Sequence, residues 1–142
     1  KQQLFGCFLL TIALVAAIKL LAMPLSGAME KNAQYKSISQ LRQDMQEEGL
    51  KTYCFGEIAP EMIWDYGSAI PVLKGEEEIL IPDGEKFAVL VIPSDENEFK
   101  RIFDPEYSYT INTVYDLNYN ADPGTKGHKN RLISNLYIVQ KR

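Results

Sequence analysis

An apolar block at the start of the chain constrains what the protein can fold into more than any other feature. Residues 2–18 carry no charge, and a second apolar run, 20–25, follows Lys19. A helix needs about 20 apolar residues to cross the hydrocarbon core of a bilayer. Leu4–Met23 supplies that length if Lys19 extends its ammonium group to the interface. The block therefore predicts a transmembrane helix within residues 1–25.

Two other interpretations of the block stay open. A secretory signal peptide also combines a positive start with an apolar stretch, and Ser26-Gly27-Ala28 resembles its small-residue cleavage site. A buried core helix is the third alternative, although the block has almost no polar face to expose. The first two interpretations both place the following domain outside the cytoplasm. Because the chain begins with Lys1 rather than Met, we expect it to be the tail of something longer.

Charge is divided unequally along the 142 residues. Residues 1–25 contain no acidic side chain, whereas residues 26–142 hold 13 basic and 19 acidic ones, a net charge of −6. An acidic domain is a poor match for phosphate backbones, which excludes nucleic acid as the main partner. With only Cys7 and Cys54, the chain is not a disulfide-stapled scaffold. We expect a membrane segment at 1–25 and one extracytoplasmic domain over 26–142.

Helix and strand signals alternate in the second part of the chain. Apolar residues at helical spacing predict helices over 37–49, 60–66 and 94–103, and short apolar or alternating runs predict strands over 50–55, 70–73, 79–81, 87–92, 107–119 and 136–139. We expect the first helix to begin with a capping box of Ser37 and Gln40 and to end at Gly49. The order predicts an α/β fold, a small open sandwich with a mixed central sheet.

Three strand predictions are more specific. Residues 87–92 are continuously apolar, so both faces of this strand should be covered. Pro71 lacks an N–H and restricts 70–73 to a sheet edge. Tyrosines alternate with mostly polar residues over 107–119, which predicts one aromatic face, and 136–139 should form the second arm of a hairpin.

The sequence lacks the common catalytic signatures, including phosphate-binding glycine loops, a nucleophile elbow and a zinc-protease helix. We predict no catalytic residue, no cofactor and no metal site. His128, the single histidine, is interpreted as an exposed loop residue without a partner, and Cys54 as a small buried hydrophobe. Glu76-Glu77-Glu78 could bind a hard cation, but a solvated loop is the preferred interpretation.

One segment is a candidate ligand or partner surface, and it comprises Glu57, Glu61, Trp64 and Tyr66. It begins at the carboxyl end of a predicted strand, where open α/β sheets place ligands. Its carboxylates and aromatic rings would suit a sugar or a partner loop. Core packing of Trp64 and Tyr66 explains the aromatic rings without any ligand, and it is the preferred interpretation of these two residues.

The end of the chain, 126–142, contains five basic side chains and no acid. It could contact anionic lipid headgroups, or it could keep a strand edge solvated.

Several of these segments follow one another in an order known from another class of protein. An apolar helix and an amphipathic helix ending at Gly49 precede Tyr53-Cys54-Phe55-Gly56-Glu57, Pro60 through Trp64-Asp65-Tyr66-Gly67, Ile70-Pro71-Val72-Leu73 and Phe87-Ala88-Val89-Leu90-Val91. This order resembles the C-terminal part of bacterial polytopic glycosyltransferases, the family of the protein O-mannosyltransferases and the lipid A aminoarabinose transferases. The resemblance covers about residues 4–95.

The resemblance implies a parent enzyme that passes a sugar from a polyprenyl-phosphate donor to an acceptor at the outer face of the bacterial inner membrane. The family's catalytic acids lie on loops between earlier membrane helices, so the resemblance implies a non-catalytic periplasmic domain here. Its partners would be membrane lipid, upstream membrane helices of the same parent chain, and the polyprenyl-phosphate sugar or the acceptor. The family's basic residue after Tyr-Gly is replaced by Ser68 and Ala69. The alternative is a free-standing binding module, membrane-anchored or secreted, with no enzymatic activity.

Overall fold

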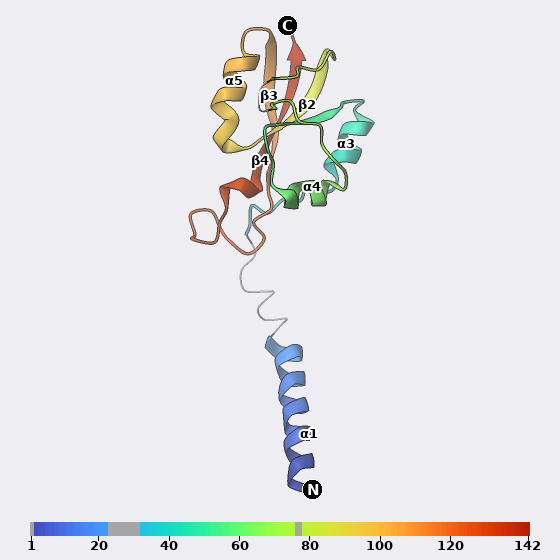
Figure 1. The fold of residues 1–142 in the computed structure, drawn as a ribbon, viewed down its shortest axis with the longest axis vertical. Helices are drawn as coiled ribbons and strands as arrows, with labels where there is room; N and C mark the ends of the chain where they lie inside the picture. Colours follow the sequence, from blue (N-terminus) through green and yellow to red (C-terminus); the bar gives the residue numbers. More distant parts are fainter. Residues whose placement is uncertain (1, 23–31, 76–77) are drawn as a thin grey trace.

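A computed structural model describes residues 2–22, 32–75 and 78–142 (Figure 1). The elements in chain order are α1 (Gln2–Ala17), the π-helical turn η1 (Ile18–Ala22), α3 (Leu41–Glu47), β1 (Thr52–Phe55), α4 (Pro60–Tyr66), β2 (Lys86–Val91), the 3-10 turn η2 (Pro93–Asp95), α5 (Glu96–Phe103), β3 (Tyr107–Asp116), the 3-10 turn η3 (Asn130–Leu132) and β4 (Ile133–Lys141).

The four strands form one mixed sheet in the order β1-β2-β4-β3. β1 and β2 run parallel, and β4 runs antiparallel to both β2 and β3. The predicted α/β class and mixed sheet are confirmed, as is the hairpin formed by β3 and β4. The carboxyl ends of β1, β2 and β3 therefore lie at the same end of the sheet as the start of β4. We call this the β3-end of the sheet.

Helices cover both faces of the sheet. On one face, the cluster contains Leu41 and Met45 of α3, Met62 of α4 and Ile38, which precedes α3. On the other face, the cluster contains Phe99 and Phe103 of α5. β2 contributes alternate residues to both clusters, so its predicted burial on both faces is confirmed. The sandwich prediction holds only in part, because the middle of β3 is largely exposed.

The aromatic face predicted for 107–119 is wrong. Tyr107 and Tyr109 pack on the α5 face, whereas Tyr115 packs on the face covered by α3 and α4. The reason is a β-bulge between Ile111 and Thr113. One extra residue in a strand of period two moves every later side chain to the opposite face.

The first domain helix is also shorter than predicted, since α3 begins at Leu41 and not at Ser37. The carboxylate of Asp65 explains the difference. Its Oδ2 accepts hydrogen bonds from the Ser37 hydroxyl at 2.7 Å and from the Ile38 N–H at 2.8 Å, so these donors do not form the predicted capping box. The predicted end is confirmed, because Gly49 has a φ of 69°.

The short strands predicted over 70–73 and 79–81 do not form, and each of these segments makes one isolated β-bridge instead. Val72 bridges Cys54 in parallel, with the Cys54 N–H donating to the carbonyl of Pro71, which confirms the edge position. Ile79 bridges Lys74.

The apolar block forms a helix shorter than predicted. α1 ends at Ala17, and the backbone changes to a π-helical turn at Ile18 before the α-helix reaches the length of about 20 residues that a span needs. Within the described ranges, no helix is both long and apolar enough to cross a membrane. The transmembrane helix predicted within residues 1–25 is therefore not found, although its last part, from Met23, lies outside the described residues. All residues from 6 to 20 are exposed.

Candidate functional site

The candidate segment forms α4, and local sequence explains both ends of this helix. Pro60 occupies its first turn, where a missing N–H costs nothing, and Gly67 ends it in the left-handed conformation with a φ of 80°. Asp65 ties the helix to the turn before α3 through the Ser37 and Ile38 contacts. These features fix which side of α4 faces outward.

Trp64 lies on that outward side and is 89% exposed. Its neighbour Ile63 is 40% exposed. Both line a shallow, mostly apolar hollow of about 550 Å³, together with Pro60, Gly67, Ser68 and Ala69. Core packing, the preferred interpretation of Trp64, is therefore wrong, because the indole contributes nothing to the buried clusters. We call this surface, formed by Pro60, Ile63, Trp64 and Ala69, the α4 patch.

Glu61 forms a bidentate ion pair with Arg131, with its two oxygens 2.8 Å and 2.6 Å from the guanidinium nitrogens. Hydrogen bonding to Arg131 lowers the pKa of Glu61 to about 2. Both side chains are about half exposed, so the pair joins α4 to η3 at the surface. A carboxylate held in this way is not poised to accept or donate a proton near neutral pH.

Tyr66 and Glu57 lie elsewhere. Tyr66 is half-buried and packs against the cluster beneath α3 and α4, so the core interpretation holds for this ring. Glu57 lines a second hollow of about 620 Å³ at the carboxyl ends of β1 and β2, with Lys74 and Asp95 among the other lining residues. The four candidate residues therefore do not form one site. Only Glu61 and Trp64 lie together on the exposed surface of α4.

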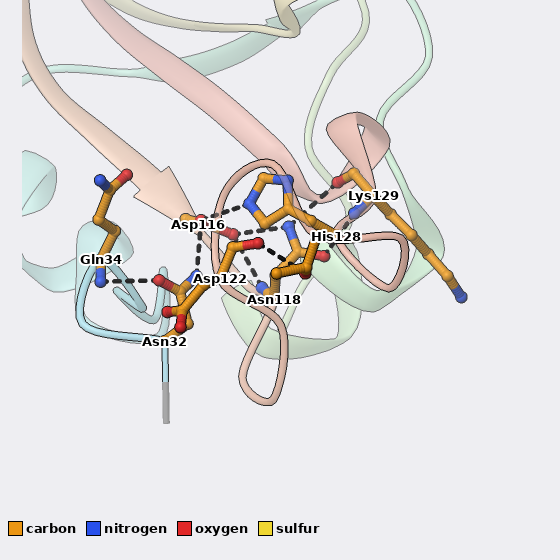
Figure 2. A network of polar contacts seen from close by, with 8 residues as sticks. Asn32, Gln34, Asp116, Asn118, Asp122, His128 and Lys129 are labelled. Atoms are coloured by element: carbon orange, nitrogen blue, oxygen red, sulfur yellow. Dashed lines mark hydrogen bonds and ion pairs between the residues drawn. The ribbon is translucent and has the colours of Figure 1, made fainter. Parts of the chain in front are cut away.

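A buried polar network at the β3-end of the sheet was missed by sequence reasoning. Figure 2 shows Asn32, Asn118 and His128 directed at the carboxylate of Asp116. One carboxylate oxygen accepts from Asn32 Nδ2 at 2.9 Å and lies 3.0 Å from His128 Nε2. The other accepts from the backbone N–H and the side-chain amide of Asn118 at 2.9 Å and 2.7 Å. The only sequence signal was the Asp116-Leu117-Asn118 turn at the end of a strand.

His128 therefore has a partner, and the prediction of an exposed, unpartnered histidine is wrong. The side chains of His128 and Asp116 are 7% and 5% exposed. Burial opposes ionisation of Asp116, but hydrogen bonds from Asn118, His128 and Asn32 outweigh it and lower its pKa. This carboxylate contacts two side-chain amides, an imidazole and a backbone N–H, and none of these groups is a hydroxyl or thiol that could act as a nucleophile. The network thus fits a structural role better than a nucleophilic one.

The network instead secures the long loop between β3 and β4. Asn118 Oδ1 accepts from the Lys129 N–H at 2.8 Å, and its amide donates to the Lys129 carbonyl at 3.1 Å. Asn32, the first residue of the described domain, is held by the same carboxylate. This arrangement fixes the place where the chain enters the domain.

The described residues contain no group of three or more His, Cys, Asp or Glu side chains that could hold a metal ion. Glu76 and Glu77 lie outside the described residues. Cys54 is buried, as predicted, and burial raises the pKa of its thiol to about 11, so it is not a nucleophile at neutral pH.

No family model, no curated protein and no solved structure matches the chain. Function has therefore to be inferred from the residues and their arrangement.

Proposed function

We propose that the chain is a non-catalytic extracytoplasmic domain of a membrane glycosyltransferase, held at the bacterial inner membrane by the helix α1. The parent enzyme would transfer a sugar from a polyprenyl-phosphate donor to an acceptor. In this proposal the domain shapes the outer side of that enzyme, and bond making takes place on other segments.

The observation that carries the proposal is the exposure of an apolar helix. Side chains from Phe8 to Leu20 are exposed along α1 and η1, including Leu10 at 75% and Leu14 at 63%. Lys19 is the single charged residue among residues 2–22. Such a surface is unstable in water and favours a lipid or protein environment. Membrane lipid and neighbouring apolar helices of a parent chain both satisfy this requirement.

The segments of the sequence resemblance also adjoin one another in the fold, which supports the proposal. Residues 53–57 comprise the end of β1 and the turn after it, residues 60–67 comprise α4 and its C-cap, and residues 70–73 lie beside Cys54 at the sheet edge. They make one continuous region. These three segments of the pattern therefore lie side by side in the fold.

Two acidic side chains of the described residues are held in structural contacts, and this favours a supporting role. Among the described residues, the buried acid Asp116 is held by four hydrogen-bond partners, and the exposed Glu61 is neutralised by Arg131. Neither group is available for acid–base chemistry in this arrangement.

A second candidate is a free-standing anchored binding module. The α4 patch favours it, because an exposed indole beside a hollow is a common feature of binding surfaces. The two candidates differ in whether other membrane helices belong to the same assembly.

Localisation can be tested with alkaline phosphatase fused after Arg142, because this reporter is active only outside the cytoplasm. We expect an active fusion in a bacterial host. A fusion that is present at normal levels but inactive would overturn the extracytoplasmic placement. A matched fusion that lacks residues 1–22 should be inactive and controls for α1.

The non-catalytic role can be tested by incubating the purified chain with a polyprenyl-phosphate sugar and a mixed acceptor pool. No transfer or hydrolysis of the sugar is expected. Measurable turnover that is retained after repeated purification would contradict the proposal.

A further inference from the structure

We propose that Trp64 and Ile63 of the α4 patch, together with Lys126 and Lys129, form a surface that docks on the headgroup layer of an anionic bilayer. This inference rests on the proposed anchoring by α1 and names the partner of the α4 patch. It also assigns an orientation to the domain, with the β3-end of the sheet toward the membrane.

The first support is the chemistry of the patch. An indole that is 89% exposed, next to an isoleucine that is 40% exposed, leaves apolar area in water. Trp is the side chain most characteristic of the membrane–water interface, because its ring is apolar and its N–H needs a polar partner. The hollow beside Trp64 is shallow and lined mostly by apolar atoms, which suits acyl and glycerol groups better than a charged ligand.

The second support is the position of the patch relative to the incoming chain. The Asn32 N–H donates to the carbonyl of Tyr119, and the Lys36 N–H donates to the carbonyl of Asp116, each across the β3-end of the sheet. The carboxylate of Asp65 in α4 accepts hydrogen bonds from Ser37 and Ile38, the two residues that come after Lys36 in the chain. Figure 1 shows α4 and the loop before η3 at this end, with the C-terminus at the opposite end.

The sequence also limits how far this end can lie from the anchor. Residues 23–31 join η1 to Asn32. A chain of that length reaches at most about 36 Å even when fully extended. This is close to the width of a domain of this size, whose radius of gyration is roughly 13 Å. Only a fully extended linker would therefore let the opposite end of the domain face a bilayer that holds α1, so the end that carries Asn32 and α4 is the favoured one.

The third support is charge. Lys126 and Lys129 are exposed and form no ion pair with any side chain in the described ranges. Figure 2 shows the ammonium group of Lys129 extending away from the Asp116 network. Of the acids nearby, Glu61 is paired with Arg131, and Asp122 is the one acid of the loop. Basic side chains near an anionic surface gain about 1 kcal/mol each, which is about fivefold in a docking equilibrium.

These observations favour a lipid surface over a protein partner. The proposed surface combines one large aromatic ring with two lysines at the same end of the sheet rather than a broad apolar area, and stable protein interfaces need roughly 800 Å² on each partner. Lysine is moreover depleted at protein interfaces, whereas it is favoured beside anionic headgroups.

Trp64 is the single tryptophan of the chain, so its fluorescence reports this surface directly. The full chain is reconstituted into phosphatidylcholine vesicles with and without phosphatidylglycerol, and sedimentation is measured together with emission. In the anionic vesicles we expect emission at shorter wavelength, quenching by lipids brominated on the upper acyl chain, and protection from iodide. The double variant Lys126→Gln/Lys129→Gln should weaken this docking by roughly 30-fold, with sedimentation unchanged.

Lys86→Gln/Lys141→Gln provides the matched control, because both lysines are exposed and lie at the opposite end of the sheet. This control should leave Trp64 emission unchanged. If the chain sediments with vesicles but Trp64 stays accessible to iodide and is not quenched by brominated lipid, the docking surface is wrong and the anchoring stands. If Trp64 is protected without lipid quenching and the particle mass doubles, a second copy covers the patch and the inference is overturned. A chain that does not sediment at all overturns the anchoring and the docking surface together.

Discussion

At the end of β1, Gly56 adopts a conformation that residues with side chains avoid. Its φ is 76°, and a Cβ built at this position would lie 2.6 Å from Asp95 Oδ2. We therefore expect Gly56→Ala to lower the free energy of unfolding by about 1–3 kcal/mol, through backbone strain and displacement of Asp95. Urea unfolding of the full chain in mild detergent, followed by circular dichroism, measures this effect.

Gly84→Ala is the control for this substitution. The nearest atom to its added Cβ would be the Lys86 carbonyl oxygen at 3.8 Å, an ordinary contact. The change in unfolding free energy should stay within about 0.5 kcal/mol. Equal destabilisation by the two substitutions would contradict the assigned conformation of Gly56.

Asp116 gives the domain a pH-dependent stability. Its hydrogen bonds lower its pKa in the folded state below the unfolded value, which is about 3.9 for Asp. This stabilisation is therefore complete above the pKa of Asp116 in the unfolded state, and it is lost as the pH falls through the pKa of Asp116 in the folded state. Asp116→Asn should destabilise the domain by about 1–3 kcal/mol at pH 7, because buried donors lose their acceptor.

The difference between wild type and Asp116→Asn should be largest at neutral pH and should narrow below about pH 4. Thermal melts from pH 7 to pH 3 measure this dependence. Exposed Asp83→Asn, outside the network, serves as the control and should show little difference at any pH. A difference in melting temperature between wild type and Asp116→Asn that stays constant across that range would mean that ionisation of Asp116 does not stabilise the fold.

At the level of elements, the bulge in β3 determines which tyrosines enter which cluster. Asn112 is the exposed extra residue between Ile111 and Thr113. Deleting Asn112 restores strict alternation, so residues on one side of the deletion must exchange faces. We expect loss of cooperative unfolding in circular dichroism melts. Asn112→Ala keeps the bulge and should change stability by at most about 0.5 kcal/mol. A deletion variant that melts like Asn112→Ala would contradict the assigned register.

Local sequence signals predicted several elements well. Pro60 and Gly67 predicted both ends of α4, because each acts on the backbone of its own residue. The apolar run of β2 predicted burial on both faces, since that property follows from composition alone. The α/β class followed from the alternation of such elements.

The remaining features depend on contacts between distant residues. The bulge in β3 depends on its pairing with β4, so alternation along one strand could not reveal it. The start of α3 depends on Asp65, which is 28 residues from Ser37. The network joins Asn32 to Asp116 across 84 residues. The exposure of Trp64 depends on which side of α4 faces the sheet, and a helix of seven residues has too few apolar positions to predict that side.

On the scale of the whole molecule, the two main features are an exposed apolar helix and a domain with one specialised end. The Asp116 network, the Lys126–Arg131 loop, α4 and the first described residue of the domain all lie at the β3-end of the sheet. We propose that this end faces the bilayer and that α1 supplies the attachment. The opposite end carries the C-terminus. This orientation requires that α1 associates with lipid.

Retention of the full chain in membranes washed with alkaline carbonate tests this requirement most directly. We predict that the chain stays in the membrane pellet, and that Leu10→Glu/Leu14→Glu, which places two charges on the apolar surface of α1, is released. Glu substitutions at two exposed positions of the folded domain, Lys51 and Lys86, control for added negative charge and should leave the chain in the pellet. Release of the unaltered chain into the supernatant would contradict the account.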